Sequence, residues 1–408
     1  MAKVIPFRGI FYNPAKVSGD EVIAPPYDII TPEYREVLYQ KSPYNIVRID
    51  FGKEFQGDDD SNNRHTRAKD FFEQWIREGV FVRDEQPSFY AYEIDYNLHG
   101  ETKRLRGILA MVKIEELGRG VYPHEATHSK PKADRLNLMR ACLANISPIY
   151  SLYNSPEKIT TGIIDNISGA PYISAKDMDG ATHKLYKISE ESKIDLIIRE
   201  LSDKAIFIAD GHHRYEVALE FKKEMGEGPW EYVLMFLANM ADHGIAVLPT
   251  HRMVKGIKRE DVLGRLEPDF AIQTCGLECD IVERLSHEGK NTFGLYLGSN
   301  EKWYILKYKG TDLEDVPSVL RSLDVVVLHE LIIKKDLGIT DVAYEMDITE
   351  SIKRVRKGDF DAVFFLNPTG VNDVEKVALS GLRMPPKSTY FYPKLLTGMV
   401  INKFIVDG

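Results

Sequence analysis

Cysteine is scarce in this chain, which has only Cys142, Cys275 and Cys279 among its 408 residues. Small secreted domains that depend on a disulfide framework carry more cysteines at short spacings. Cys275 and Cys279 are separated by three residues and have no second pair, so the sequence does not indicate a zinc knuckle. The chain must therefore fold around its hydrophobic residues, which make up 43% of the sequence.

Long apolar runs and an excess of positive charge are also missing. No run approaches the roughly 20 apolar residues that a membrane-spanning helix needs. The first residues, MAKVIPFRGIF, lack the apolar core of a signal peptide. Lys and Arg number 53 against 62 Asp and Glu, a net charge of −9 that disfavours a general nucleic-acid surface. We expect a cytoplasmic protein that binds neither membrane nor nucleic acid.

The common nucleotide-binding motifs do not occur. The sequence contains no G-x-x-x-x-G-K-[ST] loop and no set of protein-kinase motifs. An ordinary adenine-nucleotide fold is therefore not evident from the residues.

The pattern of apolar residues predicts a mixed α and β fold of the α+β class. We expect three consecutive regions: an N-terminal α/β region at 1–120, a core at 121–254 and a C-terminal α/β region at 255–408. The main predicted helices are 64–78, 132–144, 317–335 and 373–379. The main predicted strands are 88–96, 105–112, 147–153, 205–210, 231–238, 245–248 and 362–366.

The most informative stretch is AIFIADGHHRYEVA at 205–218. Its apolar run predicts a buried strand that ends at the turn pair Asp210-Gly211, and the residues that follow have helical spacing. His212, His213 and Arg214 then occupy the first turn of a helix, where backbone N–H groups and the helix dipole favour an anion. Because the guanidinium is a planar fork suited to phosphate oxygens, this stretch predicts an anion-binding turn.

A second polar cluster, YPHEATHSKPKADR at 122–135, lies on a proline-bounded loop. His124 and His128 are four residues apart, a spacing that could hold a metal on a helix, but the prolines argue against a helix here. A solvated loop is the second interpretation. The third is phosphoryl transfer, which needs cations and a base for the attacking hydroxyl. Its candidates are His124, Glu125, Thr127, Lys130, Lys132 and Arg135.

Three further sites have a structural and a functional interpretation. Asp28 follows Pro25-Pro26-Tyr27 and is either a pocket residue or a turn cap. His251 and Arg252 end a buried strand, where they contact a phosphate or carboxylate or are simply exposed. Lys387 and Ser388 lie in a turn-rich segment that also contains Lys394, which is either a packed closing segment or part of a site.

The string GHHRYEVA resembles the phosphate-binding turn G-x-x-R-Y/R-x-A of the ParB and sulfiredoxin fold. The longer string ADGHHRYEVA resembles a family of domains of unknown function whose members have been linked to free-serine kinases. Other matching stretches are IAPPYD at 23–28, HE at 124–125 with KPKADR at 130–135, LPTHR at 248–252, and 385–398. The resemblance implies a ParB/sulfiredoxin-like core at 121–254, with Gly211, Arg214 and Tyr215 in the phosphate-binding turn.

The resemblance also implies an activity, the phosphorylation of free L-serine to O-phospho-L-serine. Glu125 would be the general base, because those kinases place a glutamate in a similar Pro-His-Glu context, and the catalytic set would also contain Asp210, His212 and His213. The missing nucleotide motifs favour pyrophosphate as donor, with ADP or ATP as alternatives. Mg²⁺ is expected, with Asp210 as its carboxylate. A ParB-like nucleotide-binding switch and a metal-dependent hydrolase remain alternatives, and a homo-oligomer remains open.

Overall fold

The computed structural model describes residues 3–126, 129–257, 261–276, 280–298, 301–310 and 313–404, with the side chains of 129–131 left aside. The chain forms two compact units. Unit 1 contains residues 1–123, 127–246 and 393–408, and unit 2 contains residues 124–126 and 247–392. This division differs from the three consecutive regions expected from the sequence, because each unit is assembled from separate segments. The predicted mixture of helices and strands is confirmed.

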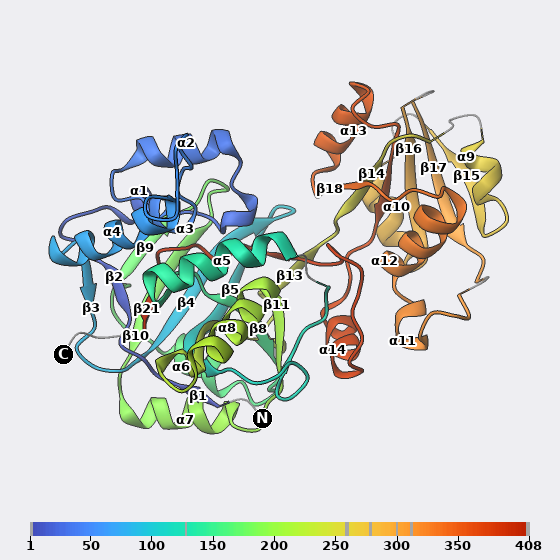
Figure 1. The fold of residues 1–408 in the computed structure, drawn as a ribbon. Coiled ribbons are helices and arrows are strands. Elements are labelled where there is room, and N and C mark those ends of the chain that lie inside the picture. The colour runs from blue at the N-terminus through green and yellow to red at the C-terminus, as the bar shows by residue number, and fades with distance from the viewer. Residues whose placement is uncertain are drawn as a thin grey trace. The chain divides into compact units, whose positions relative to one another are not determined.

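Unit 1 is built on a mixed sheet with the strand order β6-β11-β8-β12-β5-β4-β10-β9, and β1 pairs with β5 (Figure 1). The pairs β11–β6 and β12–β8 are parallel, and the other pairs are antiparallel. The strands are β1 (Val4–Ile5), β4 (Phe89–Leu98), β5 (Glu101–Lys113), β6 (Val121–Tyr122), β8 (Ile149–Tyr153), β9 (Ile173–Lys176), β10 (Thr182–Ile188), β11 (Ile206–Asp210) and β12 (Tyr232–Asn239).

Two helices that carry predicted site residues pack side by side in unit 1 (Figure 1). They are α5 (Ser129–Cys142) and α8 (His212–Met225). Leu136 and Met139 of α5 and Val217 and Phe221 of α8 join one hydrophobic core with the central strands. Burial of these side chains, each worth about 1.5–3 kcal/mol, fixes both helices against the sheet and so positions their first turns.

The remaining elements of unit 1 surround this core. The C-terminal segment enters the unit at Pro393 and forms backbone hydrogen bonds with Ala24, Ile10 and Leu143. The other elements are α1 (Gly19–Val22), η1 (Tyr27–Ile29), α2 (Pro32–Lys41), α3 (Val47–Asp50), α4 (Arg64–Arg77), α6 (Ile159–Asp165), α7 (Glu191–Leu201), η2 (Pro229–Glu231) and the strand pairs β2 (Ile10–Tyr12) with β3 (Phe81–Arg83) and β7 (Ala144–Asn145) with β21 (Asn402–Lys403).

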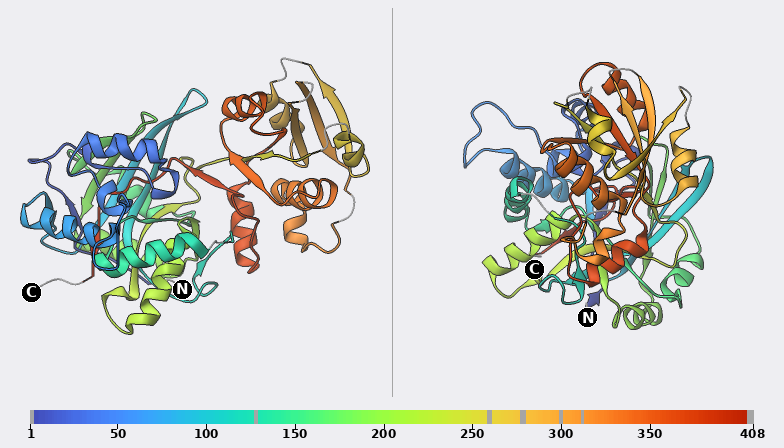
Figure 2. Two further views of the ribbon diagram at one scale, coloured as in Figure 1. Left: turned by 45° about the horizontal axis from the view of Figure 1, so that its top comes forward. Right: turned by 90° about the vertical axis from the view of Figure 1, so that its right-hand side faces the viewer.

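Unit 2 contains an antiparallel sheet with the order β15-β17-β16-β19-β14-β18. Figure 2 shows this part of the chain in yellow to orange-red from two further directions. Its strands are β14 (His251–Val254), β15 (Phe270–Cys275), β16 (Thr292–Leu297), β17 (Lys302–Tyr308), β18 (Val342–Glu345) and β19 (Ala362–Leu366). Helices α10 (Ile281–Glu288) and α13 (Ile348–Arg356) share a hydrophobic core with Met253, Val363 and Phe365 of the sheet. The unit also contains α9 (Val262–Leu266), α14 (Val371–Leu379), and β20 (Tyr390–Tyr392), which pairs with β13 (Ala246–Leu248).

The single helix predicted at 317–335 is wrong. The structure has α11 (Ser318–Arg321), α12 (Asp324–Val327) and the π-helix η3 (Leu328–Asp336). Leu323 is extended, with φ −91° and ψ 120°, which interrupts the helix before Asp324. The Asp324 carboxylate then accepts a hydrogen bond from the backbone N–H of Asn291 at 2.7 Å, a tertiary contact that apolar spacing cannot reveal. Among the residues described, no helix has the length and apolar character to cross a bilayer.

Candidate functional site

The turn between β11 and α8 has the strand-glycine-helix form that the sequence predicts. Gly211 adopts the left-handed conformation with φ +97°, which glycine reaches without steric cost. The register of β11 against β8 shifts between Ile208 and Asp210, and such irregularities redirect a side chain. A Cβ atom on Gly211 would lie 2.8 Å from Nε of Arg214, so the missing side chain leaves room for the guanidinium to fold back over the turn.

Arg214 and Lys394 both approach the Asp210 carboxylate. The Nη2 atom of Arg214 lies 4.0 Å from Oδ1 of Asp210, and Nζ of Lys394 donates a hydrogen bond to Oδ2 at 2.9 Å. Arg214 also donates a hydrogen bond from Nη1 to the carbonyl of Pro148. Both cations are only 13% exposed. Two cations from distant parts of the chain are therefore held around one carboxylate beside the start of α8.

Arg135 of α5 is a third cation of unit 1 that is largely removed from solvent. Its Nη1 and Nη2 donate to Oδ1 and the backbone carbonyl of Asp50 at 2.9 and 2.7 Å, and its Nε and Nη2 donate to Asp134 at 2.9 and 2.6 Å. The guanidinium lies 4.0 Å from the ring centroid of Tyr27. Hydrogen bonds to two carboxylates and stacking on Tyr27 thus fix the orientation of the Arg135 guanidinium.

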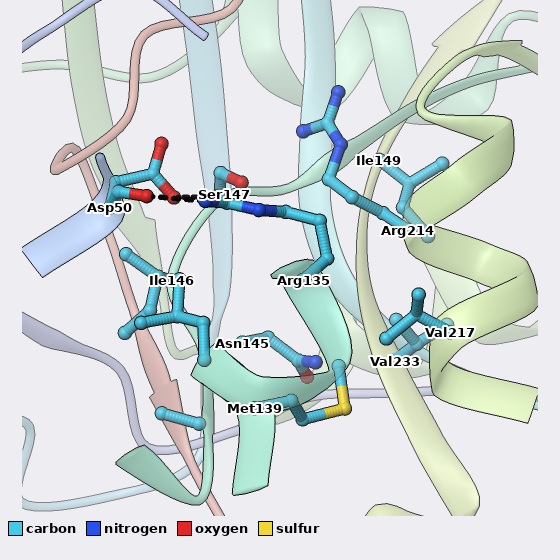
Figure 3. Close-up of a pocket in the computed structure, with 12 residues that line it drawn as sticks. Asp50, Arg135, Met139, Asn145, Ile146, Ser147, Ile149, Arg214, Val217 and Val233 are labelled. Carbon is cyan, nitrogen blue, oxygen red and sulfur yellow. Dashed lines mark hydrogen bonds and ion pairs between the residues drawn. The ribbon is translucent and has the colours of Figure 1, made fainter. Parts of the chain in front are cut away.

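Arg135 and Arg214 line the same cavity, which has a volume of about 40 Å³ (Figure 3). In Figure 3 the Arg135 side chain points toward Asp50, and Arg214 extends from α8. The lining also includes Ser147 and Asn145, and its remaining residues are mainly apolar. A cavity of this size accommodates an ordered water molecule beside the two arginines.

Burial and the neighbouring charges shift the pKa values of three groups that contact Arg135. Burial raises the pKa of Asp50, and the charges of Arg135 and Arg214 partly offset that increase. Burial also raises the pKa of Tyr27 to about 12, with an opposing contribution from Arg135. For Asp134, burial is outweighed by hydrogen bonds and charges from His65, Arg135 and Arg64, which hold the pKa of its carboxyl well below the usual range. Asp134 therefore remains ionised and anchors Arg135.

We expect Gly211→Ala to destabilise the protein and to weaken anion binding together. An alanine at φ +97° is strained by about 1–2 kcal/mol, and its Cβ would displace the Arg214 guanidinium. Urea unfolding and pyrophosphate titration measure the two effects. Gly118→Ala is a matched control, because Gly118 has φ +90° and an added Cβ there would meet no atom within 4 Å. Equal loss of pyrophosphate affinity in both variants would contradict the role of Gly211.

The other predicted site residues of unit 1 differ in burial and in the contacts that they make. Tyr215 is fully buried, and its hydroxyl donates to the carbonyl of Glu115 at 2.7 Å and accepts from the N–H of Glu115 at 3.0 Å. It therefore anchors α8 in the core. Lys132 forms an ion pair with Glu216 of α8. His212 and His213 are partly exposed in the first turn of α8, and Asp28 is exposed in η1 beside Tyr27.

Glu125 and His124 belong to unit 2, where they hold the segment 383–389. Oε1 of Glu125 accepts a hydrogen bond from the backbone N–H of Lys387 at 2.8 Å. The His124 carbonyl accepts from Met384 N–H at 2.7 Å, and its Nε2 lies 2.9 Å from Oγ1 of Thr389. Glu125 and His124 therefore fix this segment of unit 2 through hydrogen bonds to Lys387, Met384 and Thr389.

Arg252 is the buried cation of this part of unit 2. It is 2% exposed, and Nη2 donates to the carbonyl of Lys387 at 3.0 Å. Burial lowers the pKa of Arg252 to about 10, with opposing contributions from Tyr344 and Glu125. The backbone of Lys387, with φ +58°, thus contacts Arg252 through its carbonyl and Glu125 through its N–H.

His251 and Arg252 do not share a pocket, although the sequence placed them together. Successive strand residues point to opposite faces of a sheet. His251 lies against Phe365, with ring centroids 4.9 Å apart, and burial lowers the pKa of its imidazole to about 3. His251 is therefore a neutral core residue.

Ser388 is also buried, and its hydroxyl donates to the Pro385 carbonyl at 2.6 Å. Lys387 is exposed. Thr127 and the side chain of Lys130 lie outside the described residues. Among the residues that are described, no group of three or more His, Cys, Asp or Glu side chains is arranged to hold a metal ion.

Two residues that contact the Arg135 guanidinium were missed by sequence reasoning, namely Asp50 and Tyr27. Asp50 lies in the apolar stretch NIVRIDF, which reads as core, and only its burial next to Arg135 reveals its importance. Tyr27 belongs to the APPYD stretch, in which the sequence indicated Asp28 as the candidate pocket residue. Lys394 was noted only as part of a polar C-terminal segment, although it is the residue of that segment that contacts Asp210.

Residues 4–326 match the model of the family described as a protein of unknown function, DUF1015. The chain belongs to this family. The prediction of a family of unknown function is therefore confirmed. No curated protein sequence matches this DUF1015 chain.

Several solved structures are similar to this DUF1015 protein at a low level. A free serine kinase in complex with AMP is 13% identical, with a TM-score of 0.38 over 72% of this chain and 92% of that one. A conserved hypothetical protein from Pyrococcus furiosus is 15% identical, with a TM-score of 0.36 and coverages of 72% and 95%. SbnI from Staphylococcus aureus, truncated at its C-terminus, is 12% identical, with a TM-score of 0.38 and coverages of 71% and 85%. At this level neither the reactions nor the ligands of those proteins transfer to this chain.

Proposed function

We propose that this DUF1015 protein is a small-molecule phosphotransferase, and that its acceptor is the hydroxyl of free L-serine. The convergence of Arg214, Lys394 and Arg135 near the start of α8 in unit 1 carries the proposal. Phosphoryl transfer depends mainly on positioning and on balancing negative charge, and these cations supply both. The resemblance of ADGHHRYEVA to a phosphate-binding turn supports the same assignment.

The phosphate groups of the donor are proposed to bind at the first turn of α8. The helix dipole favours negative charge there, and Arg214 is held beside it by Pro148 and Asp210. Lys394 would contact the same anion from the other side of Asp210. Arg135 would supply longer-range positive charge, because most of its N–H donors bind Asp50 and Asp134. His212 and His213, partly exposed in this turn, are proposed to contact the donor or the transferred phosphoryl group.

Glu125 remains the proposed base for the serine hydroxyl, because its Pro-His-Glu context resembles that of free-serine kinases. Asp210 and Asp28 are the alternatives. Mg²⁺ is proposed to neutralise phosphate oxygens. The residues fit such an ion only partly, because both oxygens of Asp210 face cations, so Asp210 would contact it through water. The donor phosphates would then be the main ligands.

The direct test is incubation of the protein with L-serine, Mg²⁺ and each of pyrophosphate, ADP and ATP, followed by detection of O-phosphoserine by mass spectrometry. Phosphoserine formed with any donor, and absent without protein, supports the proposal. Absence with all three donors would reject serine phosphorylation. Nucleotide binding without transfer would favour the ParB-like switch instead.

The donor can be identified by thermal stabilisation. A ligand that binds only the native state raises the melting temperature according to its concentration and affinity. If the α8 turn holds phosphate without a nucleoside slot, pyrophosphate should raise the melting temperature more than ATP at equal concentration. Differential scanning fluorimetry measures the shift. A larger shift with ATP or ADP would identify a nucleotide donor and leave the transferase proposal intact.

A further inference from the structure

A chain of buried polar groups in unit 1 lies outside the residues that contact the proposed phosphate site. Tyr92 of β4 and His183 of β10 are both fully buried and are diagonal neighbours, because Tyr92 pairs with Leu185 and His183 with Ile94. The Tyr92 hydroxyl lies 2.7 Å from Nδ1 of His183, and Nε2 of His183 lies 3.0 Å from Oδ2 of Asp177. Buried polar groups that are fully hydrogen-bonded in this way fix one conformation.

The direction of these hydrogen bonds follows from the aspartate. Oδ1 of Asp177 accepts from the N–H groups of Asp179 and Ala181 at 3.0 and 2.8 Å. Burial by itself raises the pKa of Asp177. The hydrogen bonds and the interaction with His183 outweigh burial and bring this pKa below its usual value, so the carboxylate is ionised. An ionised carboxylate only accepts, so His183 donates from Nε2. In the neutral tautomer that carries its proton on Nε2, Nδ1 accepts from the Tyr92 hydroxyl.

The Tyr92 oxygen then accepts a hydrogen bond from the backbone N–H of Leu396 at 3.2 Å. Leu396 lies two residues after Lys394, whose ammonium contacts Asp210. The next residue, Thr397, exchanges backbone hydrogen bonds with Ala24 at 2.8 and 3.2 Å. The hydrogen bonds that run from Asp177 through His183 and Tyr92 therefore end on the short segment that contains Lys394.

We propose that Tyr92, His183 and Asp177 are positioning residues that hold the segment 394–397 so that Lys394 faces Asp210 and a bound phosphate. The hydrogen bonds alone support the conclusion that the segment is fixed. The effect of this fixed segment on phosphate binding rests on the proposed function. Lys394 has a long, flexible side chain, so fixing its backbone reduces the conformational freedom lost on binding.

The first experiment measures amide hydrogen exchange in the segment 394–397 without any ligand. Amide hydrogen exchange of the peptide containing residues 394–397 should be at least about threefold faster in Tyr92→Phe than in the wild type, because Leu396 loses its acceptor. Tyr96→Phe is the matched control, since it also removes a buried hydroxyl from β4. The Tyr96 hydroxyl donates to the Gly244 carbonyl and not to the segment 394–397. Unchanged exchange in Tyr92→Phe, or equal acceleration in both variants, would overturn the proposal. Asp177→Asn should give the same direction of change if Tyr92→Phe fails to fold.

The second experiment measures pyrophosphate binding by calorimetry in a double-mutant cycle. Tyr92→Phe should weaken binding about threefold to fivefold in the wild-type background and have no further effect in the Lys394→Ala background. Equal effects in both backgrounds would show a general structural role and would reject positioning through Lys394. If the wild type binds neither pyrophosphate nor nucleotide, the proposed function fails, and the exchange experiment still decides whether the polar chain holds the segment.

Discussion

Glu125→Gln is expected to lower kcat for serine phosphorylation by about 10²–10⁴-fold, the usual contribution of a positioned base. The amide keeps the size of the side chain, and its oxygen can still accept the hydrogen bond that Oε1 of Glu125 receives from Lys387 N–H. The substitution therefore removes the proton acceptor and preserves the segment 383–389. Donor affinity should change little. Steady-state kinetics of phosphoserine formation, together with donor titration, measure both quantities.

Glu350→Gln provides a matched control for this experiment. Glu350 is a surface residue of α13 in the same unit, paired with Lys353, and its substitution should leave kcat unchanged. If Glu125→Gln retains wild-type kcat and loses only donor affinity, Glu125 has a structural role. The base would then be sought with Asp210→Asn and Asp28→Asn, which remove the two alternative carboxylates of unit 1.

Arg214→Lys is expected to lower activity at least about tenfold, which corresponds to roughly 1.4 kcal/mol of transition-state binding. Lysine keeps the positive charge but loses the planar fork that reaches the Pro148 carbonyl and Asp210 simultaneously. The core contacts of α8 come from Val217 and Phe221, so the fold should survive. Enzyme kinetics and circular dichroism measure the two effects.

Arg140→Lys makes the same chemical change on the surface of unit 1. Arg140 pairs with Glu224 in a solvent-exposed ion pair, which contributes little to stability. Activity should remain at the wild-type level in this variant. Wild-type turnover in a folded Arg214→Lys protein would remove the phosphate-binding role of Arg214.

The sequence by itself determined the local elements that carry the candidate site. The strand, the glycine turn and the helix at 206–225 could be predicted because apolar periodicity and the left-handed tolerance of glycine act over a few residues. The strands β4, β5 and β19 were predictable for the same reason. Family membership was also readable, because ADGHHRYEVA is a contiguous string.

The tertiary structure alone decided which side chains meet. Arg135 contacts Asp50 across 85 positions and Lys394 contacts Asp210 across 184, and both pairs depend on how distant elements pack. The same packing places Arg135 and Glu125 in different units, although they are close in sequence. It also sends His251 into the core and Arg252 to the other face of the sheet, since neighbouring strand residues alternate. Local patterns specify helices, strands and turns, whereas the partners of a charged side chain depend on the path of the whole chain.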